Sequence, residues 1–98
     1  GGFAPDFMRR EPKVAQFVKG IHDQQKVVAA ICHGGWMLVS AGILKGRKAT
    51  CFFAIKDDLI AAGADYVDEE VVVYKNIITS RKPEDLSAFV VEIIKQLS

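Results

Sequence analysis

The run Val27-Val28-Ala29-Ala30-Ile31-Cys32-His33-Gly34-Gly35 decides the fold of this 98-residue chain. Its first five residues are apolar without alternation, which is typical of a strand covered on both faces in a parallel sheet. Two glycines follow the cysteine and the histidine at once. Residues 36–41 then have the character of a short helix, which Gly42 ends. The run therefore predicts a buried strand that turns sharply into a helix.

A nucleophile at the tip of a sharp strand-to-helix turn is the nucleophile elbow of α/β hydrolases. Cys32 holds that position here. It lies at the carboxyl end of the strand, where open α/β sheets bind ligands. It also precedes a helix N-terminus, whose partial positive charge favours thiolate over thiol. The next backbone N–H, that of His33, is expected to help stabilise an oxyanion. The pattern predicts that Cys32 is a reactive cysteine.

A structural role for Cys32 is the alternative, because a buried free cysteine behaves as a small hydrophobe and Ile31 precedes it. However, an imidazole and two glycines are not typical of the end of an ordinary core strand. Their presence favours a functional role for Cys32. His33 is expected either to share a pocket with the thiol, as its base or cationic partner, or only to cap the turn. The residues alone leave both roles of His33 open.

The segments around the elbow predict helices that alternate with buried strands, and hence an α/β domain with a mostly parallel sheet. Lys75-Asn76 separates two β-branched runs at the two-residue spacing of a hairpin. The last helix carries an apolar stripe from Leu86 to Leu97. The other expected elements are a loop (residues 1–11), a helix from Pro12, a second strand (47–53), a helix (55–62), a short strand (66–67), the hairpin strands (71–74 and 77–80) and a last helix from about Pro83.

Net charge, hydropathy and cysteine count exclude several classes of function. The net charge is +1 with acids and bases interspersed, which argues against a nucleic-acid binder. No apolar run approaches the length of a membrane span, and no charged-then-apolar leader opens the chain, so the expected location is cytoplasmic. Two cysteines, Cys32 and Cys51, are too few for a disulfide framework and lack zinc-site spacing. The sequence predicts free thiols in a reducing compartment, with no metal and no cofactor.

Several motifs together resemble the PfpI family of intracellular cysteine hydrolases, and they occur in family order over essentially the whole chain. The resemblance depends on all of these motifs together and not on any one of them. The matching segments are Ala30-Ile31-Cys32-His33-Gly34, Ser40-Ala41-Gly42-Ile43-Leu44-Lys45-Gly46-Arg47-Lys48, Lys56-Asp57-Asp58-Leu59-Ile60, Ala62-Gly63-Ala64, Val71-Val72-Val73 and Thr79-Ser80-Arg81-Lys82-Pro83-Glu84-Asp85-Leu86.

The resemblance implies a flavodoxin-like, three-layer sandwich of the class I glutamine amidotransferase type. It also implies a set of site residues. Cys32 would be the nucleophile and His33 its partner. Asp6 would be the third group, a carboxylate that reaches the histidine from a neighbouring subunit of a dimer or larger ring. The Gly2 N–H would be the second oxyanion donor. The family usually has proline where Gly35 stands, and Glu more often than Asp at the position of Asp6.

The resemblance further implies that residues 1–98 are the C-terminal portion of such a domain. In the family, strands and helices precede the position of Gly1, and one of them supplies a glutamate that hydrogen-bonds the reactive thiol. Few apolar strand residues are present to cover the apolar faces of the predicted helices, which agrees with a partial domain.

Three hypotheses about function follow. The first is a thiol-dependent enzyme of stress protection, a protease, glyoxalase III-like hydratase or deglycase, in which Cys32 attacks a peptide, an α-oxoaldehyde such as methylglyoxal, or its adduct on protein. The second is a non-catalytic redox sensor or stress chaperone, in which Cys32 is oxidised reversibly. The third is an inactive fragment. The sequence does not distinguish the substrates, because each reaction begins with a thiolate at a carbonyl.

Overall fold

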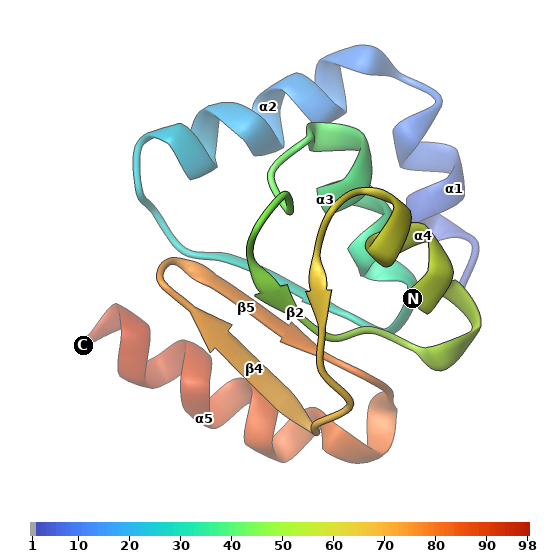
Figure 1. Cartoon of the computed structure of the whole chain (residues 1–98). Coiled ribbons are helices and arrows are strands. Elements are labelled where there is room, and N and C mark those ends of the chain that lie inside the picture. Colours follow the sequence, from blue (N-terminus) through green and yellow to red (C-terminus); the bar gives the residue numbers. More distant parts are fainter. Residues whose placement is uncertain (1) are drawn as a thin grey trace.

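The computed structural model describes residues 2–98 (Figure 1). Three short 3-10 turns, η1 (Cys32–Gly34), η2 (Phe53–Ile55) and η3 (Pro83–Asp85), lead into the last three helices. The helices are α1 (Ala4–Arg9), α2 (Pro12–Asp23), α3 (Gly35–Ala41), α4 (Lys56–Ala61) and α5 (Leu86–Leu97). The strands are β1 (Val28–Ile31), β2 (Lys48–Ala49), β3 (Asp65–Tyr66), β4 (Val71–Tyr74) and β5 (Ile77–Ser80).

The strands form two small sheets. In the larger, with the order β1-β5-β4, β1 runs parallel to β5, and β4 and β5 form an antiparallel hairpin. In the smaller, β2 runs parallel to β3. Helix α5 packs on β4 and β5, whereas α2 and α3 contact β1 (Figure 1). The domain is therefore mixed α/β, and the predicted hairpin is confirmed, with Lys75 of its turn at φ +54°.

The core lies between the sheets and α3 and α4. Strand β5 is buried at all four positions, and Leu59 of α4 is completely buried. The apolar stripe of α5 is a different case: Phe89 is buried, but Val90 and Ile94 lie on the surface. The residues that make up the core cluster are Val28, Leu38, Ala41, Ile43, Leu44, Ala49, Cys51, Ile55, Leu59, Ala64 and Ile77.

The prediction that β1 is covered on both faces is wrong. Val28 is buried, but Ala29 is exposed, and Ala30 and Ile31 are only half-buried. The reason is the strand order, which places β1 at the edge of the three-stranded sheet and β5 at its centre. The strand that is buried throughout is therefore β5, although it carries the polar residues Thr79 and Ser80 and β1 carries none.

The predicted loop over residues 1–11 is also wrong, because residues 4–9 form α1; Gly1 lies outside the described residues. Pro5 suits the first helical turn, Asp6 adds a favourable charge there, and Arg9 does so in the last turn. An ion pair of 2.8 Å between Asp6 and Arg10 spans one turn. The positions of Pro5, Asp6 and Arg9 therefore favour a helix, although the glycines and proline of this segment are also typical of a loop.

The second predicted strand is shorter than expected. It covers Lys48–Ala49 rather than residues 47–53, because the backbone beyond Ala49 finds its partners outside a strand ladder. The Thr50 N–H donates to Oγ1 of Thr79 at 2.9 Å, and the Phe52 N–H donates to the carbonyl of Cys32 at 3.2 Å. Residues 50–52 therefore form hydrogen bonds with Thr79 and with the turn after β1 instead of extending the sheet.

Candidate active site at the Cys32 elbow

Cys32 stands at the tip of the turn between β1 and α3. Its φ of +61° lies in the left-handed region, which a residue with a side chain rarely adopts. The following glycines leave room for this turn. A Cβ on Gly34 would lie 3.3 Å from Cβ of Ala30, and one on Gly35 would lie 3.3 Å from Cδ1 of Leu59. A strained backbone conformation at the tip of the turn, with small neighbours, matches the geometry of a nucleophile elbow.

The side chain of Cys32 meets that of the next residue. Sγ lies 3.2 Å from Nδ1 of His33, within reach of proton exchange between thiol and imidazole. The His33 ring packs between two aromatic rings, stacked on Phe52 at 5.1 Å between centroids and edge-on to Trp36 at 5.2 Å. This packing fixes the imidazole beside the thiol. Of the two arrangements that the sequence left open for His33, the structure shows the one in which it faces Cys32.

Phe52 has two contacts with the elbow that sequence reasoning missed. Its ring supports His33, and its N–H holds the carbonyl of Cys32. No sequence signal marks it, because it belongs to a segment distant from the elbow in the chain. Trp36, the second residue of α3, donates from Nε1 to Asp58 at 2.8 Å. Asp58 is thus a hydrogen-bond acceptor for Trp36 as well as a first-turn residue of α4.

Of the two family-implied residues before the elbow, Gly2 precedes α1 and Asp6 lies within it. Asp6 is on α1, and the partner of its carboxylate among the described residues is Arg10. Its side chain is 42% exposed, and its hydrogen bond of 2.8 Å joins it to Arg10 rather than to His33 of the same chain. Gly2 has a φ of +54° and lies on the surface with open space around its α-carbon. Helix α1 itself contacts α3 and η1, which places this region next to the elbow.

Cys51 differs sharply from Cys32. It is 1% exposed, whereas Cys32 is half-buried, and both are free thiols. Burial, followed by the nearby negative charge of Asp58, raises the pKa of Cys51 to about 12. Because the thiolate is the nucleophile, Cys51 is inert at neutral pH. Cys51 is therefore a small thiol of the hydrophobic core.

Alkylation of the native protein is therefore expected to discriminate between the two cysteines. Iodoacetamide at pH 7.5 should add one carbamidomethyl group, on Cys32, while Cys51 stays unmodified until the protein is unfolded. Peptide mass mapping measures both sites, and Cys32→Ser is the control, expected to take up no label under native conditions. Equal labelling of the two cysteines in the folded protein would contradict this account of their environments.

Arg81 follows β5 on the side of the sheet where Cys32 follows β1. Its guanidinium donates to both carboxylate oxygens of Asp85, at 2.8 and 3.2 Å, and to Asp68 at 3.1 Å. With Phe52, Phe53 and other residues it lines a cavity of about 200 Å³. The guanidinium holds the pKa of Asp85 below its usual range. The Arg81–Asp85 spacing of four residues, just before the last helix, is the sequence signal for this pair.

Asp85→Asn is expected to lower the free energy of unfolding at pH 7. Because folding lowers the pKa of Asp85, its ionised form stabilises the fold above the unfolded pKa of about 3.9, and this contribution is lost as the pH falls through the folded value. The difference between variant and wild type should therefore shrink below about pH 4. Urea unfolding across this range measures it, with the exposed Glu84→Gln as control. A difference independent of pH would contradict the ion-pair explanation.

Residues 2–98 hold neither a cluster of metal-ligand side chains nor a helix that could span a membrane. No group of three or more His, Cys, Asp or Glu side chains in this range is placed to hold a metal ion. No helix in the described part of the chain combines the length and apolar character that crossing a membrane requires.

Comparison with known proteins identifies the family of the chain. The model of the DJ-1/PfpI family matches residues 1–96. Deglycase PfpI of Pyrococcus furiosus is 45% identical over 97 residues, which cover 99% of this chain and 58% of that protein. General stress protein 18 of Bacillus subtilis is 48% identical over 90 residues, which cover 91% of this chain and 52% of that protein.

A solved structure shares the fold. It is a two-domain protein from Anabaena variabilis with DJ-1/ThiJ/PfpI-like and ferritin-like domains, with a TM-score of 0.97 and 49% identity over 99% of this chain and 28% of that one. The chain spans little more than half the length of the curated relatives it matches. A family match over nearly all of its residues nevertheless settles the relationship: the chain belongs to the DJ-1/PfpI family.

Proposed function

We propose that the protein is a cysteine-dependent hydrolase or deglycase that acts on carbonyl compounds, with Cys32 as nucleophile. The single observation that carries the proposal is the conformation of Cys32, a half-buried thiol at φ +61° with Sγ 3.2 Å from Nδ1 of His33. Backbone strain of this kind is retained where the surrounding structure holds it for function. The relatives named deglycases support the same class of reaction.

The first step of the proposed reaction is nucleophilic addition. The Cys32 thiol gives its proton to Nδ1 of His33, and the thiolate attacks the carbonyl carbon. A C–S bond forms, and the π electrons of the carbonyl move to its oxygen. That oxygen receives the proton back from His33, which gives a hemithioacetal with an aldehyde substrate. The N–H groups of His33 and Gly2 are the proposed donors to the transient oxyanion.

The substrate range remains part of the proposal: α-oxoaldehydes such as methylglyoxal, their adducts on proteins, or peptides. Each presents a carbonyl carbon to the same thiolate. We further propose that the protein acts in stress protection in the cytoplasm, where free thiols persist, and that its complete fold is the flavodoxin-like three-layer sandwich of the family. Contacts of α5 with β4 and β5, and of α2 and α3 with β1, support that arrangement.

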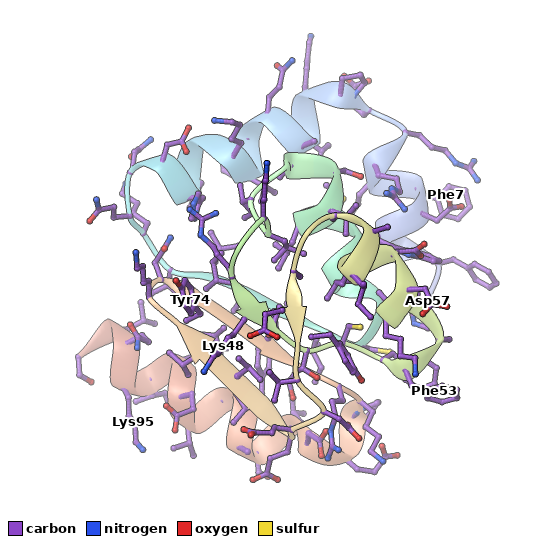
Figure 2. All side chains as sticks on the ribbon, in the orientation of Figure 1. Phe7, Lys48, Phe53, Asp57, Tyr74 and Lys95 are labelled. Carbon is purple, nitrogen blue, oxygen red and sulfur yellow. The ribbon has the colours of Figure 1, made fainter. Side chains whose placement is uncertain are left out.

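A homo-oligomer completes the proposed site. Asp6 lies on α1 with 42% of its side chain exposed, near in sequence to the strongly exposed rings of Phe3 and Phe7. Phe7 projects from the surface in Figure 2, as does Phe53 on the η2 side. Burial of such rings against a second copy is favourable and would bring a carboxylate toward a neighbouring site. In this arrangement Asp6 of one copy orients the imidazole of His33 in the next.

Turnover by the purified protein tests the proposal. Methylglyoxal, a methylglyoxal-modified peptide and an unmodified peptide are offered separately, and loss of substrate and formation of product are followed by chromatography. Consumption of at least one carbonyl substrate in proportion to enzyme concentration supports the proposal. No turnover of any of the three, by a protein with a cooperative melting transition, would overturn it. Light scattering on the same sample measures the oligomeric state.

A redox sensor is the second candidate, and the contrast between a half-buried Cys32 and a buried, inert Cys51 favours it to the same extent as catalysis. Peroxide would then add one oxygen to Cys32, giving a sulfenic acid. Intact-mass measurement after mild peroxide detects this product. If Cys32 takes up no oxygen while the protein turns over a carbonyl substrate, the sensor candidate fails and the enzyme remains.

A further inference from the structure

A second cavity lies at the end of the sheet opposite to Cys32. Cys32 follows the carboxyl end of β1, whereas this cavity is formed by segments that precede strands. His22 and Gln25 come before β1, Lys75 and Asn76 come before β5, and Arg47 comes before β2. Its volume is about 640 Å³. The four-residue length of β1, at roughly 3.3 Å a residue, separates the two places by more than 10 Å.

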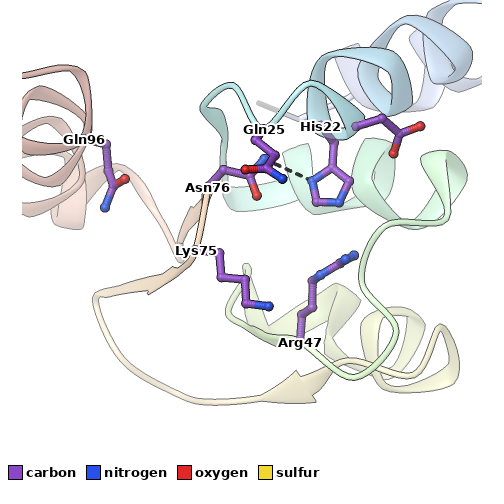
Figure 3. A pocket seen from close by; sticks show the side chains of 7 residues that line it. His22, Gln25, Arg47, Lys75, Asn76 and Gln96 are labelled. Atoms are coloured by element: carbon purple, nitrogen blue, oxygen red, sulfur yellow. Dashed lines mark hydrogen bonds between the residues drawn. The ribbon is translucent and has the colours of Figure 1, made fainter.

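The hydrogen bonds of His22 determine which ring nitrogen faces this cavity as a donor. The Asn76 side-chain Nδ2 donates to the carbonyl of Lys26 at 2.8 Å, so this atom is the amide nitrogen. The same group lies 3.1 Å from Nδ1 of His22, which must therefore accept. In the neutral ring the proton is then on Nε2. Figure 3 shows that side of the ring turned toward Arg47 and Lys75.

Charge in the cavity is predominantly positive. Arg47 and Lys75 extend toward the same space from two separate loops (Figure 3). One N–H of Arg47 donates to the carbonyl of Ile43, which anchors the guanidinium and leaves its other donors for a ligand. The carboxylate that lines the cavity, Asp23, is paired with Lys19 at 2.9 Å. Two cations and a neutral N–H donor therefore converge, and the nearest carboxylate is already paired.

Burial and the nearby Arg47 charge lower the pKa of His22, which keeps its ring neutral at pH 7. This supports the hydrogen-bond assignment, because a neutral His22 has one acceptor nitrogen for Asn76 and one donor nitrogen for a ligand. An anion in the cavity would accept from this donor while its charge is balanced by Arg47 and Lys75.

We propose that this cavity binds a phosphate group, as free phosphate or as a phosphate monoester, at a site separate from Cys32. A tetrahedral dianion matches two positive charges, and its oxygens accept from donors that arrive from different directions. A guanidinium supplies paired donors, an ammonium supplies a point charge, and an imidazole N–H supplies a directed hydrogen bond. The site does not depend on the activity of Cys32, so the two proposals succeed or fail separately.

A titration with inorganic phosphate at constant ionic strength tests the site. The imidazole ¹H–¹⁵N signals of His22 report on it, with chloride at equal ionic strength as the reference. Saturable shifts at His22 are expected in the wild type. Arg47→Gln and Lys75→Gln should each weaken binding about tenfold or more, because each removes a charge-assisted hydrogen bond. Lys48→Gln, an exposed charge beside Arg47 but outside the cavity, should leave binding within about twofold.

The Lys75→Gln variant tests the site even where Arg47→Gln fails to fold. Lys75 is an exposed turn residue, so its replacement by glutamine leaves the fold intact even if the half-buried Arg47 is less tolerant. Glycerol phosphate, run in parallel, distinguishes a monoester site, which binds it at least as well as phosphate, from a site for the free ion alone. Shifts that fail to saturate, or that are as large in Lys75→Gln as in Lys48→Gln, would overturn the proposal.

Discussion

Cys32→Ser is expected to lower kcat/KM for any carbonyl substrate of this protein by roughly 10³-fold or more, equivalent to about 4 kcal/mol of transition-state stabilisation. A serine hydroxyl has the size and position of the thiol but does not ionise near neutral pH. Among residues 2–98, Asp6 pairs with Arg10 and not with His33 beside Cys32. The exchange therefore removes the nucleophile while it preserves the turn.

Cys51→Ala is the matched control for this prediction. It removes the other thiol, which is buried and has its pKa raised to about 12, and it should leave kcat/KM within a few-fold of wild type. Steady-state kinetics of the three proteins, with melting curves to verify folding, provide the comparison. A Cys32→Ser variant that is folded and as active as wild type would remove Cys32 from the reaction.

Leu59→Ala is expected to have the largest effect on stability, a loss of about 2–5 kcal/mol in the free energy of unfolding. Leu59 is completely buried on α4, and its Cδ1 lies where any side chain on Gly35 would go, directly under the start of α3. Its truncation leaves a cavity beneath the elbow. Since domains of this size are stable by roughly 5–15 kcal/mol in total, the loss is a large fraction of the whole.

Ile60→Ala is the control on the same helix. Ile60 is 51% exposed, so truncation removes far less buried surface and should cost under about 1 kcal/mol. Urea unfolding at 25 °C compares both variants with wild type. Equal losses for the two variants would show that the packing of Leu59 under the elbow contributes less than its burial indicates.

The elbow was predictable from local sequence, because a short apolar strand, a cysteine and two glycines allow few conformations. The hairpin was predictable for the same reason: two β-branched runs flank two residues, and Lys75 adopts the positive φ that such a turn needs. The helices from Pro12 and near Pro83 followed from proline at their starts and from apolar periodicity. In each of these elements, neighbouring residues in the chain decide the structure.

The features that could not be predicted from the sequence depend on contacts between segments that are distant in the chain. The edge position of β1 follows from strand order, which no residue of β1 encodes. The early end of β2 follows from the Oγ1 of Thr79, far along the chain, which takes the N–H of Thr50. Likewise, the support that Phe52 gives to His33 and to the carbonyl of Cys32 depends on two loops meeting in space.

Mapping the substrate-derived mass during turnover tests most directly whether Cys32 is the nucleophile. The protein is acid-quenched while it consumes methylglyoxal, digested and analysed by mass spectrometry. The account predicts an added methylglyoxal on the peptide that contains Cys32, absent from the Cys51 peptide and absent when substrate is exhausted. Turnover at the full rate with the adduct on another residue, or with Cys32 blocked beforehand by iodoacetamide, would contradict it.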